Sequence, residues 1–353
     1  MESLFSSTLS QQFGHIKIFQ TKGEPLRHTS MLPSSASNKE SSTLRNKLLD
    51  SFWYWSPLQG AGRSLIAAAQ ITVLIFTPAS RLSPDSVLAD ESRCQGIRAI
   101  NAYCIWNGNE QTVSYVFAFI LFIVIVGYFP FIISLAHFYI TICLSGFITV
   151  PDGGDFVAIS ATMALVLLGL SDRRLNHWHA VKAQDSFLGF RSGIGVAAAW
   201  CLRFQVSYIY LNAAVAKLFP EEWQTGAAFY YVTKSEMFGV SSWLEKPIDF
   251  MVQFSLVTII FTWGTILFEA SVSLIFIFGS KRLRRIAVIA CIVFHIGIAL
   301  LIGIVSFATI MVGIVLVANS DVGGIQSRLW CKGNPKSSPQ SDSEIRSAVN
   351  IPS

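Results

Sequence analysis

Long apolar stretches that contain almost no charged side chains alternate with short polar segments along most of this chain. A helix needs about 20 mainly apolar residues to cross a membrane, with a usual range of roughly 17 to 25. The stretches that approach this length predict membrane-spanning helices. They are Ser64–Ser80, Val113–Val150, Phe156–Ser171, Gly193–Ala216, Met251–Phe278 and Ile286–Ser320.

Two of these stretches are long enough to contain a pair of helices. As one helix, Val113–Val150 would extend about 57 Å, roughly twice the thickness of the hydrocarbon core. The segment Gly127–Pro130 lies inside it and favours a turn. Ile286–Ser320 has the length for one span or two. We therefore predict an all-α fold, a polytopic transmembrane helical bundle with about eight spans and a lower limit of about six.

The basic residues predict the orientation of the bundle, because Lys and Arg accumulate in short cytoplasmic loops. A cytoplasmic N-terminus, combined with a turn inside Val113–Val150, places the basic segments Asp172–Arg191 and Gly279–Arg285 inside. It also places Pro151–Asp155, which has no basic residue, outside. A single span over Val113–Val150 would invert all three. We therefore predict a cytoplasmic N-terminus.

Composition supports a membrane protein. Hydrophobic residues make up 52% of the chain and charged residues 13%, against about 25% charged in soluble domains. This nearly excludes a soluble enzyme. The formal net charge is +5, but the charges lie between the apolar stretches, so we expect membrane lipid as a partner and no nucleic acid. The first apolar stretch begins too late for a cleaved signal of roughly 15 to 30 residues, which favours a retained anchor.

The polar ends of the chain differ from its middle. Residues 1–56 are predicted to be a disordered cytoplasmic region, and residues 321–353 a disordered tail, because both contain few apolar blocks. Residues 57–320 form the predicted transmembrane domain. Cys94 and Cys104 lie in the first outside loop, where an oxidising environment favours a disulfide; two unpaired thiols are the alternative.

The helix that approaches Pro220 carries many polar groups for a membrane span. It belongs to the segment RFQVSYIYLNAAVAKLFPEEW, Arg203–Trp223. At 100° per residue, Arg203, Ser207, Tyr210 and Lys217 lie within about 40° of one line, and Gln205, Tyr208 and Asn212 gather near the opposite line. Polar groups on two sides predict a helix inside the bundle or beside a water-filled cavity.

Lys217 has two interpretations. It is an anchor at the membrane interface, as most lysines at helix ends are, or an amine that acts as a base or nucleophile. Glu269 lies midway along its span and therefore needs a partner. Arg203 is a candidate for that partner by type and depth. A structural ion pair and a catalytic one both remain open.

A metal site is not expected from the sequence. His177 and His179 are two residues apart, so their side chains diverge on a helix, and there is no convincing third ligand. The sequence also contains no glycine-rich phosphate loop and no serine-centred elbow. No cofactor can be assigned from these residues.

Three segments are similar to a known family. The block YLNAAVAKLFPEEWQTGAAFYYV, Tyr210–Val232, resembles the core of the membrane proteins related to vitamin K-dependent gamma-carboxylase, which are grouped as the HTTM domain. GAGRSLIAAA at Gly60–Ala69 and FHIGIALLIGIVSF at Phe294–Phe307 more closely resemble the sporulation-delaying-protein B (SdpB) family within that group. The two-cysteine outside loop fits the same family. The resemblance covers roughly residues 57–320.

The resemblance implies a role and a location. SdpB-like proteins act with a small partner protein in the maturation of a secreted, disulfide-containing peptide toxin. We therefore expect the bacterial cytoplasmic membrane, a toxin precursor as partner, and a small accessory protein. In the carboxylases, the lysine that matches Lys217 acts as a base on the reduced quinone and faces the lumen. Their large lumenal domain has no counterpart among the short loops here, which puts carboxylation and quinone epoxidation in doubt.

We therefore predict a protein required for production or maturation of an exported antimicrobial peptide toxin. Lys217 is the expected centre of an outward-facing site, and Arg203, Tyr210, Trp223 and Glu269 are expected to line or support it. The alternatives are a non-enzymatic exporter, chaperone or immunity protein for the peptide, and a quinone-linked enzyme like the carboxylases. Whether the protein is an enzyme is left open.

Overall fold

The computed structural model describes residues 54–55, 57–84, 94–172, 174–179, 181–182, 190–235, 240 and 242–319. The predicted disordered tail at 321–353 lies outside the described residues, and so does the predicted N-terminal region except for Tyr54 and Trp55.

The described part of the chain is almost entirely helical, which confirms the all-α prediction. The elements are β1 (Tyr54–Trp55), α2 (Pro57–Phe76), α3 (Ala79–Leu82), η3 (Gly96–Ile100), α5 (Ala102–Ile105), α6 (Glu110–Val126), α7 (Pro130–Phe147), α8 (Gly153–Ser171), β2 (Val181–Lys182), α9 (Phe190–Ala216), α10 (Glu221–Gln224), α11 (Ala228–Thr233), α12 (Ser242–Val252), α13 (Ser255–Phe278), α14 (Lys281–Ile302) and α15 (Val305–Ala318). The two short strands pair antiparallel.

Six helices of the described residues are long and apolar enough to cross a membrane: α2, α7, α8, α13, α14 and the part of α9 from Ile194 to Ala216. Two further apolar helices are shorter. They are α6 and α15, with 17 and 14 residues. The structure is therefore a polytopic helical bundle within the predicted range of spans.

Both predicted helix pairs are present, and a left-handed glycine ends the first helix of each. Gly127 follows α6 with φ of 86°, and α7 begins at Pro130. Gly303 follows α14 with φ of 80°, and α15 begins at Val305. Because only glycine adopts positive φ without steric cost, these two positions separate the apolar stretches into two helices each.

The first helix begins earlier than the apolar stretch predicts. It starts at Pro57 rather than Ser64, and its first two turns contain the buried polar side chains of Gln59 and Arg63. Arg63 donates from Nη1 to Nδ1 of His177 at 3.2 Å. Apolar length does not predict these two turns, because Arg63 is buried against a residue of a distant loop.

The loops gather at two opposite ends of the bundle. The N–H of Thr149, between α7 and α8, donates to the Leu82 carbonyl after α2 at 2.9 Å. At the other end, the N–H of Phe129, between α6 and α7, donates to the Leu175 carbonyl after α8 at 2.8 Å. Successive helices that alternate in direction require this grouping. By the predicted topology, the end that contains Thr149 faces outside.

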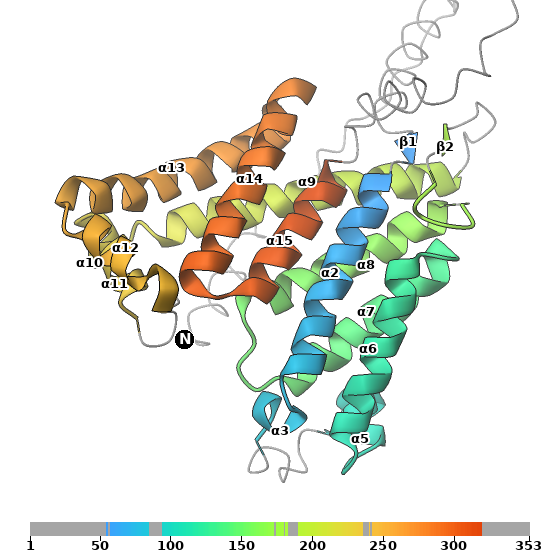
Figure 1. Cartoon of the computed structure of the whole chain (residues 1–353). Coiled ribbons are helices and arrows are strands. Elements are labelled where there is room, and N and C mark those ends of the chain that lie inside the picture. The colour runs from blue at the N-terminus through green and yellow to red at the C-terminus, as the bar shows by residue number, and fades with distance from the viewer. Residues whose placement is uncertain are drawn as a thin grey trace, which may run out of the picture. The chain divides into compact units, whose positions relative to one another are not determined.

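The helix α2 separates two hydrophobic cores, and Figure 1 shows it between α15 and α6. Ile66 and Ala69 of α2 pack into the core formed with α8, α9, α13, α14 and α15. Ala67 and Leu74 of α2 pack into the core formed with α6 and α7. One helix therefore joins the two halves of the bundle.

Two glycines allow α2 and α15 to approach closely. A Cβ added at Gly62 would lie 2.5 Å from the Gly313 carbonyl oxygen, and one added at Gly313 would lie 2.7 Å from the Gly62 carbonyl oxygen. Contacts this short exclude a side chain at either position. Small residues at such crossings are typical of packed membrane helices.

Candidate functional site

A cavity of about 560 Å³ lies among α9, α13, α14 and α15, beside the short helices α10 and α11. Most of its lining is apolar. The lining side chains that carry polar groups are Tyr210, Lys217, Trp223, Thr233, Thr262, Thr265, Glu269 and His295. A concave, mainly apolar space with a few polar groups is the usual form of a ligand-binding site. Of the five residues that the sequence predicts for the site, this cavity brings together four.

Lys217 and Glu269 form an ion pair in the cavity wall. Nζ of Lys217 lies 2.8 Å from both carboxylate oxygens of Glu269. The side chain of Lys217 is 22% exposed and that of Glu269 only 8%. Nζ also lies 5.3 Å from the ring centroid of Trp223, a cation–π distance. The amine is therefore a partly shielded charge with an acidic and an aromatic neighbour.

The antiparallel packing of α9 and α13 explains why these two residues meet. Ser207 of α9 donates to the Ser273 carbonyl of α13 at 3.0 Å. From that contact α9 continues toward Lys217 while α13 runs back toward Glu269. Glu269 lies about one helical turn from Ser273, and the long side chain of Lys217 reaches back along α9 to meet it, with Nζ donating to the Ala213 carbonyl at 3.3 Å.

The predicted pairing of Glu269 with Arg203 is wrong. Arg203 is buried, and its Nε donates to the Ala318 carbonyl at the end of α15 at 3.1 Å. It precedes Lys217 by about 21 Å along α9 at 1.5 Å per residue. Charge type and approximate depth could not distinguish the two cations, because the register of α9 against α13 determines which one reaches Glu269.

Tyr210 lies in the cavity wall, about two helical turns before Lys217 on the same face of α9. Its side chain is 2% exposed, and its hydroxyl has no hydrogen-bond partner among the described residues. Its ring lies edge-on to that of His295, with centroids 6.1 Å apart. The ring of Tyr210 therefore forms part of the cavity wall, whereas its hydroxyl is buried beside the Cys291 thiol of α14.

The segment that carries Trp223 is fixed to α13 by one threonine. Thr262 Oγ1 donates to the Gly226 carbonyl at 3.0 Å and accepts from the N–H of Phe229 at 3.1 Å. Gly226 has φ of 81°, and a Cβ there would lie 2.9 Å from Cγ1 of Ile259. The aromatic neighbour of Lys217 is therefore held in place by the turn between α10 and α11.

The second polar line of α9 is only partly buried. Gln205 donates to Ser160 Oγ of α8, whereas Tyr208 and Asn212 are exposed on the side of the bundle. The prediction that polar groups on two sides require burial therefore holds for the face toward α13 and fails for these two residues.

Sequence reasoning missed His295 and Thr262. His295 is buried in α14, and its Nδ1 lies 2.9 Å from the Cys291 carbonyl of the same helix. The sequence did not single out this histidine, although it lies in Phe294–Phe307, one of the three segments that carry the family resemblance. No pattern in α13 distinguishes Thr262 from its neighbouring threonines before the fold is known.

No group of three His, Cys, Asp or Glu side chains that could hold a metal ion occurs among the residues that the structure describes. His177 is instead buried between α2 and the turn after α6, beside Arg63. Burial, with the nearby Arg63 and Arg174 charges, lowers the pKa of His177 to about 3. The expected disulfide is present: Cys94 and Cys104 are joined at 2.05 Å.

Two curated proteins of Bacillus subtilis (strain 168) are similar to this chain. Sporulation-delaying protein SdpB is 28% identical over 286 residues, which cover 80% of this chain and 87% of SdpB. Uncharacterized protein YitO is 29% identical over 299 residues, which cover 80% of this chain and 93% of YitO. No family model matches the chain. No solved structure matches it.

These similarities indicate distant homology that supports an SdpB-like family. The relation to the HTTM group and to the carboxylases stays a prediction from the sequence.

Proposed function

We propose that this protein is a multi-pass protein of the bacterial cytoplasmic membrane that is required for production or maturation of an exported antimicrobial peptide toxin. The observation that carries the proposal is the Lys217–Glu269 pair in the wall of a mainly apolar cavity. The similarity to sporulation-delaying protein SdpB supports the class of process.

The pair is suited to proton transfer. To act as a base, Lys217 must first release its proton, and the Glu269 carboxylate oxygens lie close enough to accept it. That transfer converts an ammonium and a carboxylate into a neutral amine and a neutral carboxylic acid. An apolar wall reduces the free-energy difference between these two states, because it disfavours charge. The neutral amine would then face the cavity.

Tyr210 and Trp223 would position the molecule that reacts. Tyr210 lies about two helical turns from Lys217 along the same face of α9, and the Trp223 ring covers the ammonium. A bound molecule would therefore meet the Tyr210 ring near one end of the cavity and the ion pair near the other.

The test is toxin output from a producing strain whose own copy of this gene is replaced by variants. Lys217→Ala should abolish killing of sensitive cells by the culture supernatant while the membrane protein stays detectable. Lys217→Arg should also fail, because a guanidinium keeps the ion pair but does not release its proton. Unchanged output from Lys217→Ala would remove this lysine from the mechanism.

A matched control is available at Lys234. It forms an ion pair with Asp249, but both side chains are about 40% exposed and neither lines the cavity. Lys234→Ala is the same type of substitution outside the cavity, and it should leave toxin output unchanged. Equal losses at Lys217 and Lys234 would indicate a general effect on the protein.

Expression of the protein in sensitive cells distinguishes a maturation role from an immunity role. A maturation protein is needed only by the producer, so its expression alone should not protect sensitive cells from toxin-containing supernatant. Protection by the wild-type protein alone would instead support a non-enzymatic immunity role and contradict the proposal.

A further inference from the structure

The segment closed by the Cys94–Cys104 disulfide presents apolar side chains outward. We call residues 94–106 the disulfide segment. Ile97 is 84% exposed, Ile100 63% and Trp106 57%. Ile105 is 56% exposed as well. Four such residues in one short segment form an apolar surface that is costly to leave in water.

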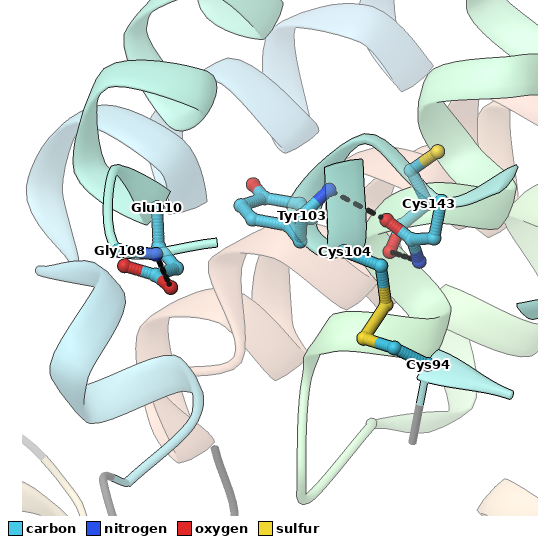
Figure 2. Close-up of a disulfide and its surroundings, with 7 residues drawn as sticks. Cys94, Tyr103, Cys104, Gly108, Glu110 and Cys143 are labelled. Atoms are coloured by element: carbon cyan, nitrogen blue, oxygen red, sulfur yellow. Dashed lines mark hydrogen bonds between the residues drawn. A yellow bond between two sulfur atoms is a disulfide. The ribbon is translucent and has the colours of Figure 1, made fainter. Parts of the chain in front are cut away.

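The position of the segment along α7 indicates what covers this surface. Asn101 Nδ2 donates to the Cys143 carbonyl at 2.9 Å, and the Tyr139 hydroxyl donates to the Ile100 carbonyl at 2.9 Å. Figure 2 shows the disulfide, Tyr103 and Cys143 of α7 close together. The segment therefore packs beside the last turns of α7 and does not project beyond its end.

The depth follows from the length of α7. Its 18 residues extend about 27 Å, no more than the roughly 30 Å hydrocarbon core. Cys143 and Tyr139 lie about 6 and 12 Å before its last residue. Helical side chains tilt toward the N-terminus, so Tyr139 reaches deeper and not outward. Ile100, bonded to Tyr139, thus lies at the level of lipid chains.

Several polar groups of the segment have hydrogen-bond partners within the protein, which lowers the cost of immersion in lipid. The N–H groups of Asn101, Cys104 and Trp106 donate to carbonyls inside the segment. Asn101 Oδ1 accepts from the N–H of Tyr103, and the Tyr103 hydroxyl lies 3.0 Å from Ser114 Oγ.

The neighbouring spans also expose large apolar side chains, so the surface of the segment resembles theirs. Phe119 of α6 and Ile142 of α7 are exposed large apolar residues of helices that pack with the segment. Arg98 is the single charged residue between Cys94 and Cys104 in the sequence. A long arginine side chain reaches from such a depth to lipid phosphates.

We propose that the disulfide segment is a membrane-embedded element whose Ile97, Ile100 and Trp106 side chains contact lipid chains of one leaflet, the outer one under the predicted topology. The disulfide closes the segment so that its short helical turns keep their internal hydrogen bonds. The segment thereby anchors the loop between α2 and α6 in the bilayer. This inference is independent of the reaction at Lys217.

Fluorine NMR of the full chain, labelled with fluorotryptophan and reconstituted in phosphatidylethanolamine–phosphatidylglycerol vesicles, tests the proposal. The chain has nine tryptophans; Trp106→Phe identifies the Trp106 line by its loss, and Ile97→Trp adds a line. We expect both lines to be broadened away by lipid that carries a nitroxide on its acyl chain. Both should persist with a water-soluble gadolinium chelate.

Asn107→Trp is the matched control, because Asn107 is exposed in the polar turn that leads to α6. Its line should be lost with the chelate. Broadening of the Ile97→Trp and Trp106 lines by the chelate would mean that water covers the surface. Broadening by neither agent would mean that protein covers it. Either result would overturn the proposal. Thiol titration should show an intact disulfide in each variant.

Discussion

Lys217 forms an ion pair with both carboxylate oxygens of Glu269 and so joins the end of α9 to the middle of α13. The two residues are 52 positions apart in the sequence. The pair lies in the wall of the cavity, so a change at either residue affects both packing and chemistry. A double substitution distinguishes the two effects.

Lys217→Ala leaves a carboxylate that is 8% exposed without its cation. We expect it to destabilise the protein by about 1 to 3 kcal/mol, less than for a fully buried pair, because the lysine is partly exposed. Adding Glu269→Gln should restore much of the loss, since an amide needs no counter-charge. Thermal unfolding of the purified protein measures this. Toxin output should stay absent in the double variant. A double variant less stable than both single variants would contradict the ion pair.

Gly62→Ala should destabilise the bundle by about 1 to 3 kcal/mol, because the new Cβ would lie 2.5 Å from the Gly313 carbonyl oxygen. The control is Gly264→Ala, where the added Cβ meets nothing within 4 Å. Only the first substitution should lower the thermal midpoint in detergent. Equal midpoints for the two variants would show that α2 and α15 are not packed at this distance.

The stability that the protein gains from a neutral His177 should be lost as pH decreases from about 6.5 toward 3. Burial lowers the pKa of His177 in the folded protein to about 3, whereas a histidine in the unfolded chain titrates near about 6.5. Between these values the unfolded state binds more protons, so the free energy of unfolding increases with pH and is lost on acidification.

The slope of the free energy of unfolding against pH measures the contribution of His177. His177→Gln should reduce the pH dependence in that window even if it lowers stability throughout. His179→Gln, which changes an exposed histidine, should keep the wild-type slope. The measurement is thermal unfolding at several pH values for the three proteins. Identical slopes for wild type and His177→Gln would exclude His177 as the titrating group.

Cys331 should react with a membrane-impermeant maleimide only after the cells are broken, because a cytoplasmic N-terminus and eight spans place the C-terminal tail inside. Cys94→Ser with Cys104→Ser should lower stability by about 2 to 4 kcal/mol. Labelling of Cys331 in intact cells would reverse the predicted orientation.

The sequence predicted the helices well where a single local rule decides. Gly127 lies in the turn that the sequence predicted, and it ends α6 because glycine adopts positive φ without steric cost. Gly303 ends α14 in the same way, but the sequence left open whether Ile286–Ser320 forms one span or two. The start of α2 was predicted too late, because Arg63 depends on a distant histidine. Apolar length cannot reveal a polar turn that is satisfied from elsewhere.

The sequence by itself determined that this protein is a membrane helical bundle, because freedom from charge over the length of a span is a property of each segment alone. It also selected Lys217, Tyr210, Trp223 and Glu269 as polar or aromatic residues of the candidate site. Only the tertiary structure decided that Glu269 pairs with Lys217 and that Arg203 binds the end of α15. The physical reason is register: when two antiparallel helices pack, a shift of a few residues determines which side chains are neighbours, and neither helix encodes that shift on its own.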